Sequence, residues 1–169
     1  DDTVEMGRLD TSDIRVHTEV SDVGAMVREV VASMRNEIDG RPVNVVCDEH
    51  PSVSIDQRLI KLAVKQLVDN ALKYSSPDTP VTVLVHNGSG VTVSVTDYGK
   101  GIPVQEQTRI FDRLYRSPAV RNQIPGSGLG LSIAQSIVRA HHGDLTVASR
   151  PGETTFRLTL PVDQKGGRI

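Results

Sequence analysis

The stretch GSGLGLSIAQSIV, residues 126–138, places three glycines at the entrance to an apolar helical pattern. Gly126, Gly128 and Gly130 occupy every second position and stop where the periodic apolar residues begin. Glycine inside a helix destabilises it by about 0.5–1 kcal/mol relative to alanine, so glycines at this place are expected to have a structural or functional role. A helix start offers free N–H groups and a partial positive charge, and glycines let a phosphate approach them closely. Taken alone, the pattern also fits a flexible loop, because it has neither P-loop nor dinucleotide-binding spacing.

A second helical pattern lies upstream, from the capping candidate Asp56 to about Tyr74. Its apolar half contains Ile60, Ala63, Val64, Leu67, Val68 and Ala71. The other half brings together Gln66, Asn70 and Lys73. Amide oxygens suit Mg²⁺ and a neighbouring lysine suits phosphate oxygens. Without other motifs, the simpler interpretation is that these three residues belong to the solvated face of an amphipathic helix.

The heptapeptide DYGKGIP, residues 97–103, directly follows a strand pattern. The Asp97 carboxylate can accept a hydrogen bond from the exocyclic amine of adenine. Gly99 and Gly101 would let a flat ligand lie near the backbone. Taken alone, this segment is better explained as a type II or I′ turn that needs positive φ.

The remaining elements are divided by glycine, proline and capping residues. We expect strands over residues 13–20, 43–47, 81–85, 91–95, 144–149 and 154–160. We expect further helices from the cap residue Ser21 to Ile38 and over residues 104–116 and 129–142. Three long helices and a mostly antiparallel sheet predict an α+β fold, a two-layer α/β sandwich.

Composition narrows the class of protein. The chain has 169 residues, of which 37% are hydrophobic and 24% charged, which is typical of one globular domain. A net charge of −2 and 3% aromatic residues argue against nucleic acid as a partner. The single cysteine, Cys47, excludes an internal disulfide and a cysteine metal cluster. No apolar run has the roughly 18 residues that a membrane-spanning helix needs, and we expect no signal peptide.

Four stretches change this interpretation when they are taken together. QLVDNALKYS, DYGKGIP, IFDRLYR and PGSGLGL follow one another over residues 66–131. This series closely resembles the N, G1, F and G2 boxes of the catalytic and ATP-binding domain of bacterial sensor histidine kinases. That domain belongs to the superfamily shared with gyrase, MutL and a heat-shock chaperone. The resemblance covers nearly the whole chain and implies the Bergerat-type fold, with a mixed, mostly antiparallel sheet packed under three helices and a mobile ATP lid.

The resemblance implies ATP and Mg²⁺ as the ligands and gives roles to individual residues. Asn70 would hold Mg²⁺ with Gln66 in the same shell, and Lys73 would meet the phosphates, so these three form the implied catalytic set. Tyr74 would lie by the adenine or ribose, and Asp97 would accept a hydrogen bond from the adenine amine. The adenine pocket would be shaped by Gly99, Gly101 and Ile102.

The resemblance also implies a lid over about residues 112–127. Phe111 would anchor its start, and one or more of Arg113, Arg116 and Arg121 would meet the γ-phosphate. The segment that wraps the phosphates would comprise Gly126, Ser127, Gly128, Leu129, Gly130 and Leu131.

Two positions depart from the family pattern. Gln66 stands where the N box usually has asparagine, and its extra methylene would shift the Mg²⁺ shell. Gyrase-like ATPases carry a glutamate there as the base that activates water, and glutamine cannot act as a base, which argues against a hydrolytic ATPase. Pro125 stands where the family often has glycine, which would stiffen one edge of the lid.

The histidines indicate where the phosphoryl acceptor lies. The family phosphorylates a histidine in an H-E-x-x-x-P type motif on a separate dimerisation domain. The chain has no histidine in that context, so we expect all five to be structural or solvated: His17, His50, His86, His141 and His142.

The resemblance therefore implies a fragment of a larger kinase. Residues 1–12 would be the remnant of the dimerisation helix and linker, 13–162 the catalytic and ATP-binding domain, and 163–169 a flexible tail. Partners would be the kinase's own dimerisation and histidine-phosphotransfer domain and, through it, a response regulator. The fragment would be a monomer and the full-length protein a homodimer. The domain would be cytoplasmic, with its parent anchored in the bacterial inner membrane.

The function implied is transfer of the ATP γ-phosphoryl group to a histidine in two-component signalling. Such a transfer depends mainly on positioning and charge neutralisation. Two alternatives remain open at this point. One is a protein-binding regulator on the same fold, such as an anti-sigma-factor kinase that acts on serine. The other is a catalytically silent nucleotide-binding scaffold, which Gln66 suggests.

Overall fold

A five-stranded sheet forms one layer of the molecule. The computed structural model describes residues 14–47, 51–107, 109–112 and 130–161. The strand order is β2-β4-β5-β7-β6, in which β2 runs parallel to β4 and the other neighbours are antiparallel. The sheet consists of β2 (Val43–Cys47), β4 (Val81–Asn87), β5 (Gly90–Asp97), β6 (Asp144–Arg150) and β7 (Glu153–Pro161). The prediction of a mixed, mostly antiparallel sheet is confirmed.

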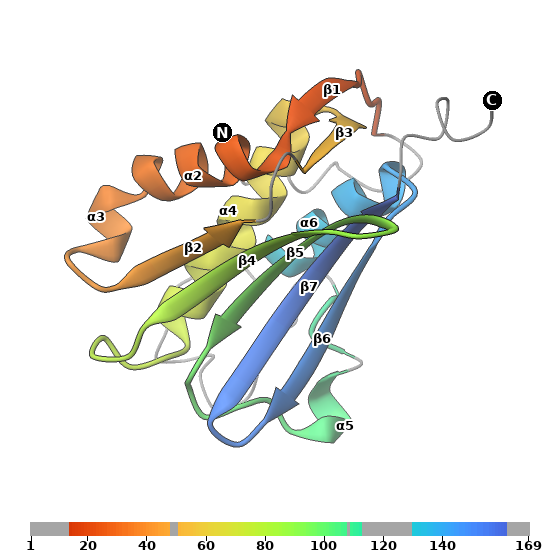
Figure 1. The fold of residues 1–169 in the computed structure, drawn as a ribbon. Helices are drawn as coiled ribbons and strands as arrows, with labels where there is room; N and C mark the ends of the chain where they lie inside the picture. Colours follow the sequence, from red (N-terminus) through yellow and green to blue (C-terminus); the bar gives the residue numbers. More distant parts are fainter. Residues whose placement is uncertain (1–13, 48–50, 108, 113–129, 162–169) are drawn as a thin grey trace.

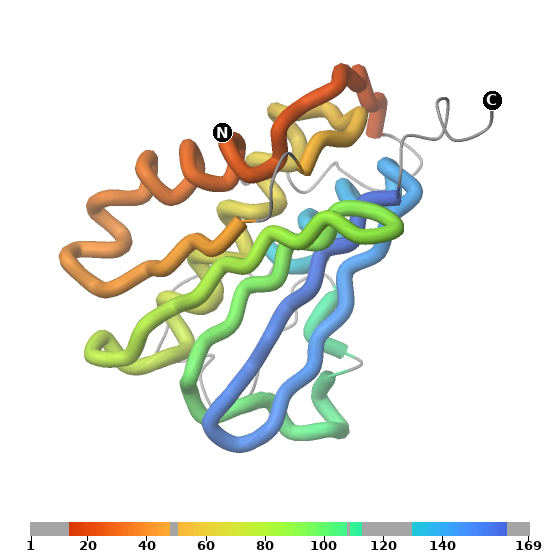
Figure 2. The backbone as a smooth tube through the Cα atoms, in the orientation of Figure 1, coloured from red at the N-terminus to blue at the C-terminus, as the bar shows by residue number. Residues whose placement is uncertain are grey.

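Three long helices form the second layer and cover one face of the sheet (Figure 1). They are α2 (Val23–Ser33), α4 (Gln57–Lys73) and α6 (Gly130–Ala140). Two short helices, α3 (Arg35–Ile38) and α5 (Val104–Gln107), lie in connections. A separate antiparallel pair joins β1 (Glu19–Asp22) to β3 (Ser52–Ile55), and Figure 2 shows this pair above the large sheet. The predicted two-layer sandwich is therefore confirmed.

The core lies between the two layers. The predicted pairing of the first hairpin is confirmed, with Val83 opposite Val95 and Val85 opposite Val93. The next strand continues the same inward row, with Phe156 opposite Val95. All of these side chains are buried, as are the predicted apolar residues of α4. Because Leu67 is fully buried at the centre of α4, its replacement by alanine should cost about 2–5 kcal/mol.

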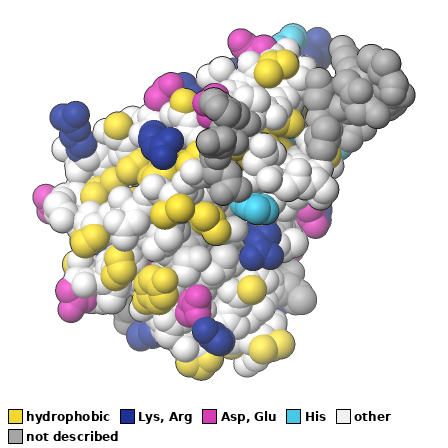
Figure 3. Space-filling model, in the orientation of Figure 1, with side chains coloured by type: hydrophobic (Ala, Val, Ile, Leu, Met, Phe, Trp, Pro, Cys, Tyr) yellow, Lys and Arg dark blue, Asp and Glu magenta, His cyan; other side chains and the backbone are white. Residues whose placement is uncertain are grey.

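The other face of the sheet is open and carries a mixture of polar and apolar side chains (Figure 3). Val46 on β2 lies beside Leu84 on β4 in the register of the sheet, and they are 54% and 42% exposed. Towards β7 the outward positions become polar or charged, as at Ser94 and Arg157. The site residues predicted from the sequence on helix α4 and at the end of β5 do not lie on this open face, because they belong to the helical layer and to one end of the sheet.

The structure corrects the sequence prediction near the N-terminus. The expected strand over residues 13–20 is wrong, because β1 is confined to Glu19–Asp22 and residues 14–18 have no strand partner. The backbone N–H of His17 donates instead to the Asp56 carboxylate at 3.0 Å. The predicted cap Ser21 is also wrong, since the carboxylate of Asp22 accepts from the N–H of Ala25 at 3.0 Å.

Two further elements differ from expectation. Strand β3 was missed, although Val53 and Ile55 alternate as buried residues, because four residues between Pro51 and Asp56 give too short a pattern. The helix expected over residues 104–116 ends at Gln107, and residues 109–112 form turns. These turns bring Phe111 against Phe156 in an edge-to-face contact, with ring centroids 6.1 Å apart.

Candidate functional site

Helix α4 is the element on which the candidate site is built. Its start is fixed by Asp56, whose carboxylate accepts from the N–H of Leu59 at 3.4 Å. Its apolar side is buried against the sheet, which leaves Gln66, Asn70 and Lys73 on the remaining surface. Gln66 and Asn70 are half-buried, whereas Lys73 is exposed at the last turn. The structure therefore brings the predicted amides and lysine to one side of a rigid helix.

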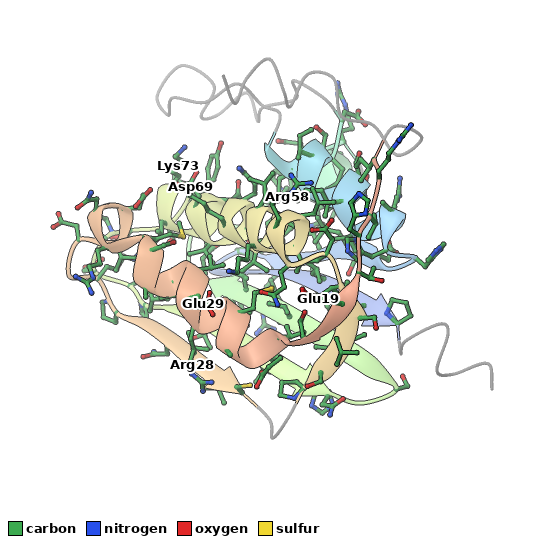
Figure 4. All side chains as sticks on the ribbon, turned by 90° about the horizontal axis from the view of Figure 1, so that it is seen from above. Glu19, Arg28, Glu29, Arg58, Asp69 and Lys73 are labelled. Carbon is green, nitrogen blue, oxygen red and sulfur yellow. The ribbon has the colours of Figure 1, made fainter. Side chains whose placement is uncertain are left out.

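Lys73 has a partner that the sequence interpretation missed. Its ammonium group lies 3.0 Å from the carboxylate of Asp69, four residues earlier, and the two side chains are 39% and 29% exposed. Figure 4 shows both on the side of α4 that faces away from α2. An exposed pair of this kind contributes about 0.3–0.5 kcal/mol. Such a weak pair can separate when a phosphate arrives, and Asp69 was recognisable from its i,i+4 spacing.

Asp97 ends strand β5 and is 3% exposed. Burial raises the pKa of its carboxyl group to about 6, although the N–H of Gly99 and the charge of Arg41 both act to lower it. The N–H of Gly99 donates to the carboxylate at 3.0 Å. The predicted acidic group is thus held in a defined orientation at the edge of the helical layer. A buried carboxyl group with a displaced pKa, at the end of a strand, is a candidate for ligand recognition.

Two glycine contacts mark the ends of the site along α4. A Cβ atom on Gly99 would collide with the carbonyl oxygen of Tyr74, where α4 ends. A Cβ atom on Gly130 would lie 2.5 Å from the side-chain oxygen of Gln66, near the middle of α4. These two contacts are about 12 Å apart along the helix axis. A ligand laid along α4 can therefore meet the buried carboxylate at one end and the start of α6 at the other.

The turn after Asp97 is tied to the far hairpin. Gly101 has φ +88°, so the positive φ expected for this turn is present. The N–H of Ile102 donates to the Ser149 hydroxyl at 2.7 Å, and Gln107 donates to the carbonyl oxygen of Ile102 at 2.8 Å. Ser149 was missed because it lies 47 residues from its partner and belongs to no motif.

The remaining predicted residues fall into two groups. Phe111 and Leu131 are half-buried and pack against the core. Leu131 follows Gly130 in the first turn of α6. The other group lies outside the described residues, together with the predicted lid beyond residue 112, and comprises Arg113, Arg116, Arg121, Pro125, Gly126, Ser127, Gly128 and Leu129.

The donors present fit a hard cation and a phosphate chain. Asn70 and Gln66 contribute neutral amide oxygens from one side of α4, and Gly130 places the first turn of α6 beside them. The free N–H groups of a helix start favour anions. A hollow of about 380 Å³ beside Arg41 is a different place, because none of the predicted site residues lines it.

Comparisons with known proteins identify the family of the chain. A family model described as histidine kinase-, DNA gyrase B-, and HSP90-like ATPase matches residues 55–164. The adaptive-response sensory kinase SasA of Crocosphaera subtropica is 32% identical over 167 residues, covering 95% of this chain and 44% of that protein. The sensor-like histidine kinase SenX3 of Mycolicibacterium smegmatis is 30% identical over 163 residues, covering 94% and 42%. The chain therefore spans less than half the length of these curated relatives.

Solved structures show the same fold. The mycobacterial sensor histidine kinase MprB matches with a TM-score of 0.76 and 30% identity, covering 87% of this chain and 99% of that one. Full-length ShkA in complex with AMPPNP matches with a TM-score of 0.75 at 21% identity, covering 95% and 34%, and it supports the fold alone. Within the described parts of the chain, none of the helices combines the length and apolarity needed to cross a membrane.

Proposed function

Because the chain belongs to the family of histidine kinase-, DNA gyrase B- and HSP90-like ATPases, we propose that it is the ATP-binding catalytic domain of a sensor histidine kinase. It would transfer the γ-phosphoryl group of ATP to a histidine on a separate dimerisation domain. The observation that carries the proposal is the spacing along α4, with buried Asp97 at one end and the start of α6 at the other. The names of its relatives, SasA and SenX3, support the kinase assignment.

The adenine end would work through Asp97. Above a pH of about 6 the carboxylate is ionised and can accept a hydrogen bond from the adenine amine. The N–H of Gly99 holds the carboxylate in place. Because Gly99 has no side chain, the end of α4 can lie close to this turn. Tyr74, Gly101 and Ile102 would border the base.

The phosphate end would work through α4 and α6 together. Lys73 would leave Asp69 to meet phosphate oxygens, while N–H groups at the start of α6 would receive others. Asn70 and Gln66 would hold Mg²⁺, which when bound neutralises phosphate charge during phosphoryl transfer. The protein would thereby orient the γ-phosphoryl group for attack by an acceptor that brings its own nucleophile.

The buried His141 is held by backbone groups and is not placed as a phosphoryl acceptor. His141 is buried, and its Nε2 accepts from the N–H of Asp56 at 3.0 Å. Since a backbone N–H can only donate, the ring is neutral and its Nδ1–H donates to the carbonyl oxygen of Ile137 at 2.8 Å. Both nitrogens of His141 are therefore occupied, so this histidine is not available as an acceptor. Since none of the five histidines of the sequence has the acceptor-motif context, we expect no stable phosphohistidine on the isolated chain.

The proposal extends to the parent protein. Its acceptor histidine would lie on a dimerisation and histidine-phosphotransfer domain preceding residue 13, and a response regulator would receive the phosphoryl group there. Full-length protein would be a homodimer with this domain in the bacterial cytoplasm and an anchor in the inner membrane. The fragment itself would be a monomer.

Nucleotide titration tests the proposal directly. We expect calorimetry to show binding of ATP and ADP, stronger with Mg²⁺, and much weaker binding of GTP. Asn70→Ala should abolish the Mg²⁺ dependence, whereas Asn44→Ala, which removes an exposed amide on β2, should leave it unchanged. A protein that binds neither ATP nor ADP at millimolar concentration would refute the proposal.

Transfer in trans separates the alternatives. Purified chain with radiolabelled ATP should label a supplied helical-hairpin dimerisation domain of a sensor kinase on histidine. Labelling of a serine substrate instead would favour the anti-sigma-factor type of kinase. Nucleotide binding without transfer to either substrate would favour a silent scaffold.

A further inference from the structure

Arg41 is an arginine outside every motif that nevertheless contacts the end of α4. It lies in the loop between α3 and β2. Its Nε donates to the carbonyl oxygen of Thr79 at 2.8 Å, and its Nη1 donates to the carbonyl oxygen of Leu72 at 3.0 Å. Its Nη2 donates to the hydroxyl groups of Ser75 and, at 3.3 Å, Thr79. One planar guanidinium group therefore holds both the last turn of α4 and the loop that follows it.

The segment that Arg41 holds, at the end of α4, lies against the turn that contains Asp97 and Gly99. Ser75, which accepts from Arg41, donates in turn to the carbonyl oxygen of Ala71 at 2.6 Å. A Cβ on Gly99 would meet the carbonyl oxygen of Tyr74, the Cα atom of Ser75 and the carboxylate of Asp97. Gly99 is also the residue whose N–H orients the Asp97 carboxylate. A short chain of contacts thus runs from Arg41 through Ser75 and Gly99 to Asp97.

The charge of Arg41 acts on the same carboxylate. Burial raises the pKa of Asp97, and the positive charge of Arg41 opposes that rise. Burial also lowers the pKa of Arg41, against the charges of Asp97 and Asp78. The neighbour of Asp97 on β7 is the uncharged Thr154, whereas Asp78 faces Arg41 from the loop after α4. Arg41 therefore favours the ionised form of Asp97 that an adenine amine requires.

We propose that Arg41 is a positioning residue for adenine recognition: it holds the end of α4 against the Gly99 turn and keeps a positive charge close to Asp97. This role rests on the proposed nucleotide-binding function. Arg41 does not touch the base in this scheme, and its effect reaches the ligand through Asp97 and the Gly99 turn. Losing it should therefore weaken adenine recognition more than phosphate recognition.

The test compares Arg41→Gln with Arg28→Gln in the purified chain. Arg28 lies on the exposed side of α2, so its replacement is a matched loss of charge away from the site (Figure 4). Calorimetry with ADP and GDP in the presence of Mg²⁺, from pH 5 to pH 8, gives affinity, base preference and the pH midpoint. We expect Arg41→Gln to weaken ADP binding about tenfold at pH 7.5, to reduce the preference for ADP over GDP, and to raise the acid midpoint by about half a pH unit or more.

A conservative variant separates positioning from charge. Arg41→Lys keeps the charge, but a single ammonium group cannot reproduce the bonds of the guanidinium group to Leu72, Ser75 and Thr79. It should therefore retain the wild-type pH midpoint and weaken ADP binding about threefold. The Arg41→Lys variant also allows the positioning role to be tested if Arg41→Gln does not fold. Carboxyl ¹³C NMR of the nucleotide-free protein would follow Asp97 directly, with a raised pKa expected in Arg41→Gln only.

The outcomes distinguish this inference from the proposed function. If wild type binds ADP but Arg41→Gln and Arg28→Gln both match it in affinity and pH midpoint, the role of Arg41 is overturned and the proposed function stands. An Arg41→Lys protein that binds ADP as tightly as wild type also overturns the positioning role. If wild type itself binds no adenine nucleotide, the proposed function fails.

Discussion

Each end of α4 lies beside a buried titratable side chain from another part of the chain, His141 at one end and Asp97 at the other, and the two are held in opposite ways. At the first end His141 is neutral, with both ring nitrogens bonded to backbone groups, and burial lowers its pKa. At the other end Asp97 is held by the Gly99 turn, and burial raises its pKa to about 6. At neutral pH His141 is uncharged, which is the form that burial favours. Asp97 is ionised at the same pH, although burial disfavours its charged form. The first arrangement stabilises the fold, whereas the second maintains the ionised acceptor that the proposed function requires.

Replacing His141 should have the largest effect on stability. His141→Ala leaves the N–H of Asp56 and the carbonyl oxygen of Ile137 without their partner in a buried place. We expect the free energy of unfolding to fall by about 2–4 kcal/mol and the melting temperature by roughly 5–15 °C. Urea and thermal unfolding measure both. ADP affinity, measured well below the melting temperature, should stay close to wild type.

The neighbouring histidine supplies the control. His142 is exposed and has φ +65°, a conformation that asparagine tolerates. His142→Asn should therefore change the melting temperature by only a few degrees. If His141→Ala and His142→Asn unfold at the same temperature, the N-terminal end of α4 does not depend on the His141 bonds.

Replacing Asp97 should have the opposite pattern of effects from replacing His141: it should lower ADP affinity and raise stability. Asp97→Asn removes the charge that, in the proposed function, accepts a hydrogen bond from the adenine amine, so ADP affinity should fall about 100-fold. The same change removes a charge that burial disfavours, and we expect the free energy of unfolding at pH 7.5 to rise by about 1–2 kcal/mol. The control is Asp39→Asn, at an exposed residue with φ +48°. An Asp97→Asn protein that is less stable than wild type at pH 7.5 would contradict this view of Asp97.

The pH dependence of stability should show both groups with opposite signs. Because the folded pKa of His141 is lowered from 6.5, its contribution is complete above pH 6.5 and is lost as the pH falls below that value. Because the folded pKa of Asp97 is raised from 3.8 to about 6, stability is lost as the pH rises between these values. Acidification from pH 6.5 to pH 4 should therefore destabilise Asp97→Asn more steeply than wild type, by about 1 kcal/mol or more. If the urea midpoints of the two proteins change in parallel across this range, Asp97 does not oppose the acid destabilisation of the wild-type protein.

Local patterns predicted much of the fold because they depend on neighbouring residues. The buried side of α4 follows a helical period, and the hairpin of β4 and β5 follows a period of two around a glycine turn. Asp97 and Gly99 were also found locally, since they belong to one short motif. Their roles toward a nucleotide remain predictions that the structure supports by geometry.

Long-range side-chain contacts could not be predicted in this way. Arg41 lies 38 residues from Thr79 and 31 from Leu72, and its sequence neighbourhood is an ordinary turn. His141 was interpreted as structural or solvated beside the helix end, but its partner Asp56 lies 85 residues away. Expectation also failed for residues 13–20, where alternating Ile14 and Val16 pack on the core without a strand partner. In each case the deciding contact forms only after the layers have packed.

The exposed pair of Asp69 and Lys73 sharpens the comparison, because it should cost little to break. Asp69→Asn should change the free energy of unfolding by less than about 0.5 kcal/mol, yet it frees Lys73 for phosphate. We expect ATP affinity to rise by up to about threefold at low salt, and the gain to shrink as salt screens the charges. Glu29→Gln breaks a similar exposed pair with Lys61, 2.8 Å long and joining α2 to α4, and should leave ATP affinity unchanged. If both variants alter ATP binding equally, net charge governs the effect. If only Asp69→Asn does, Lys73 belongs to the phosphate end and exchanges its partner there.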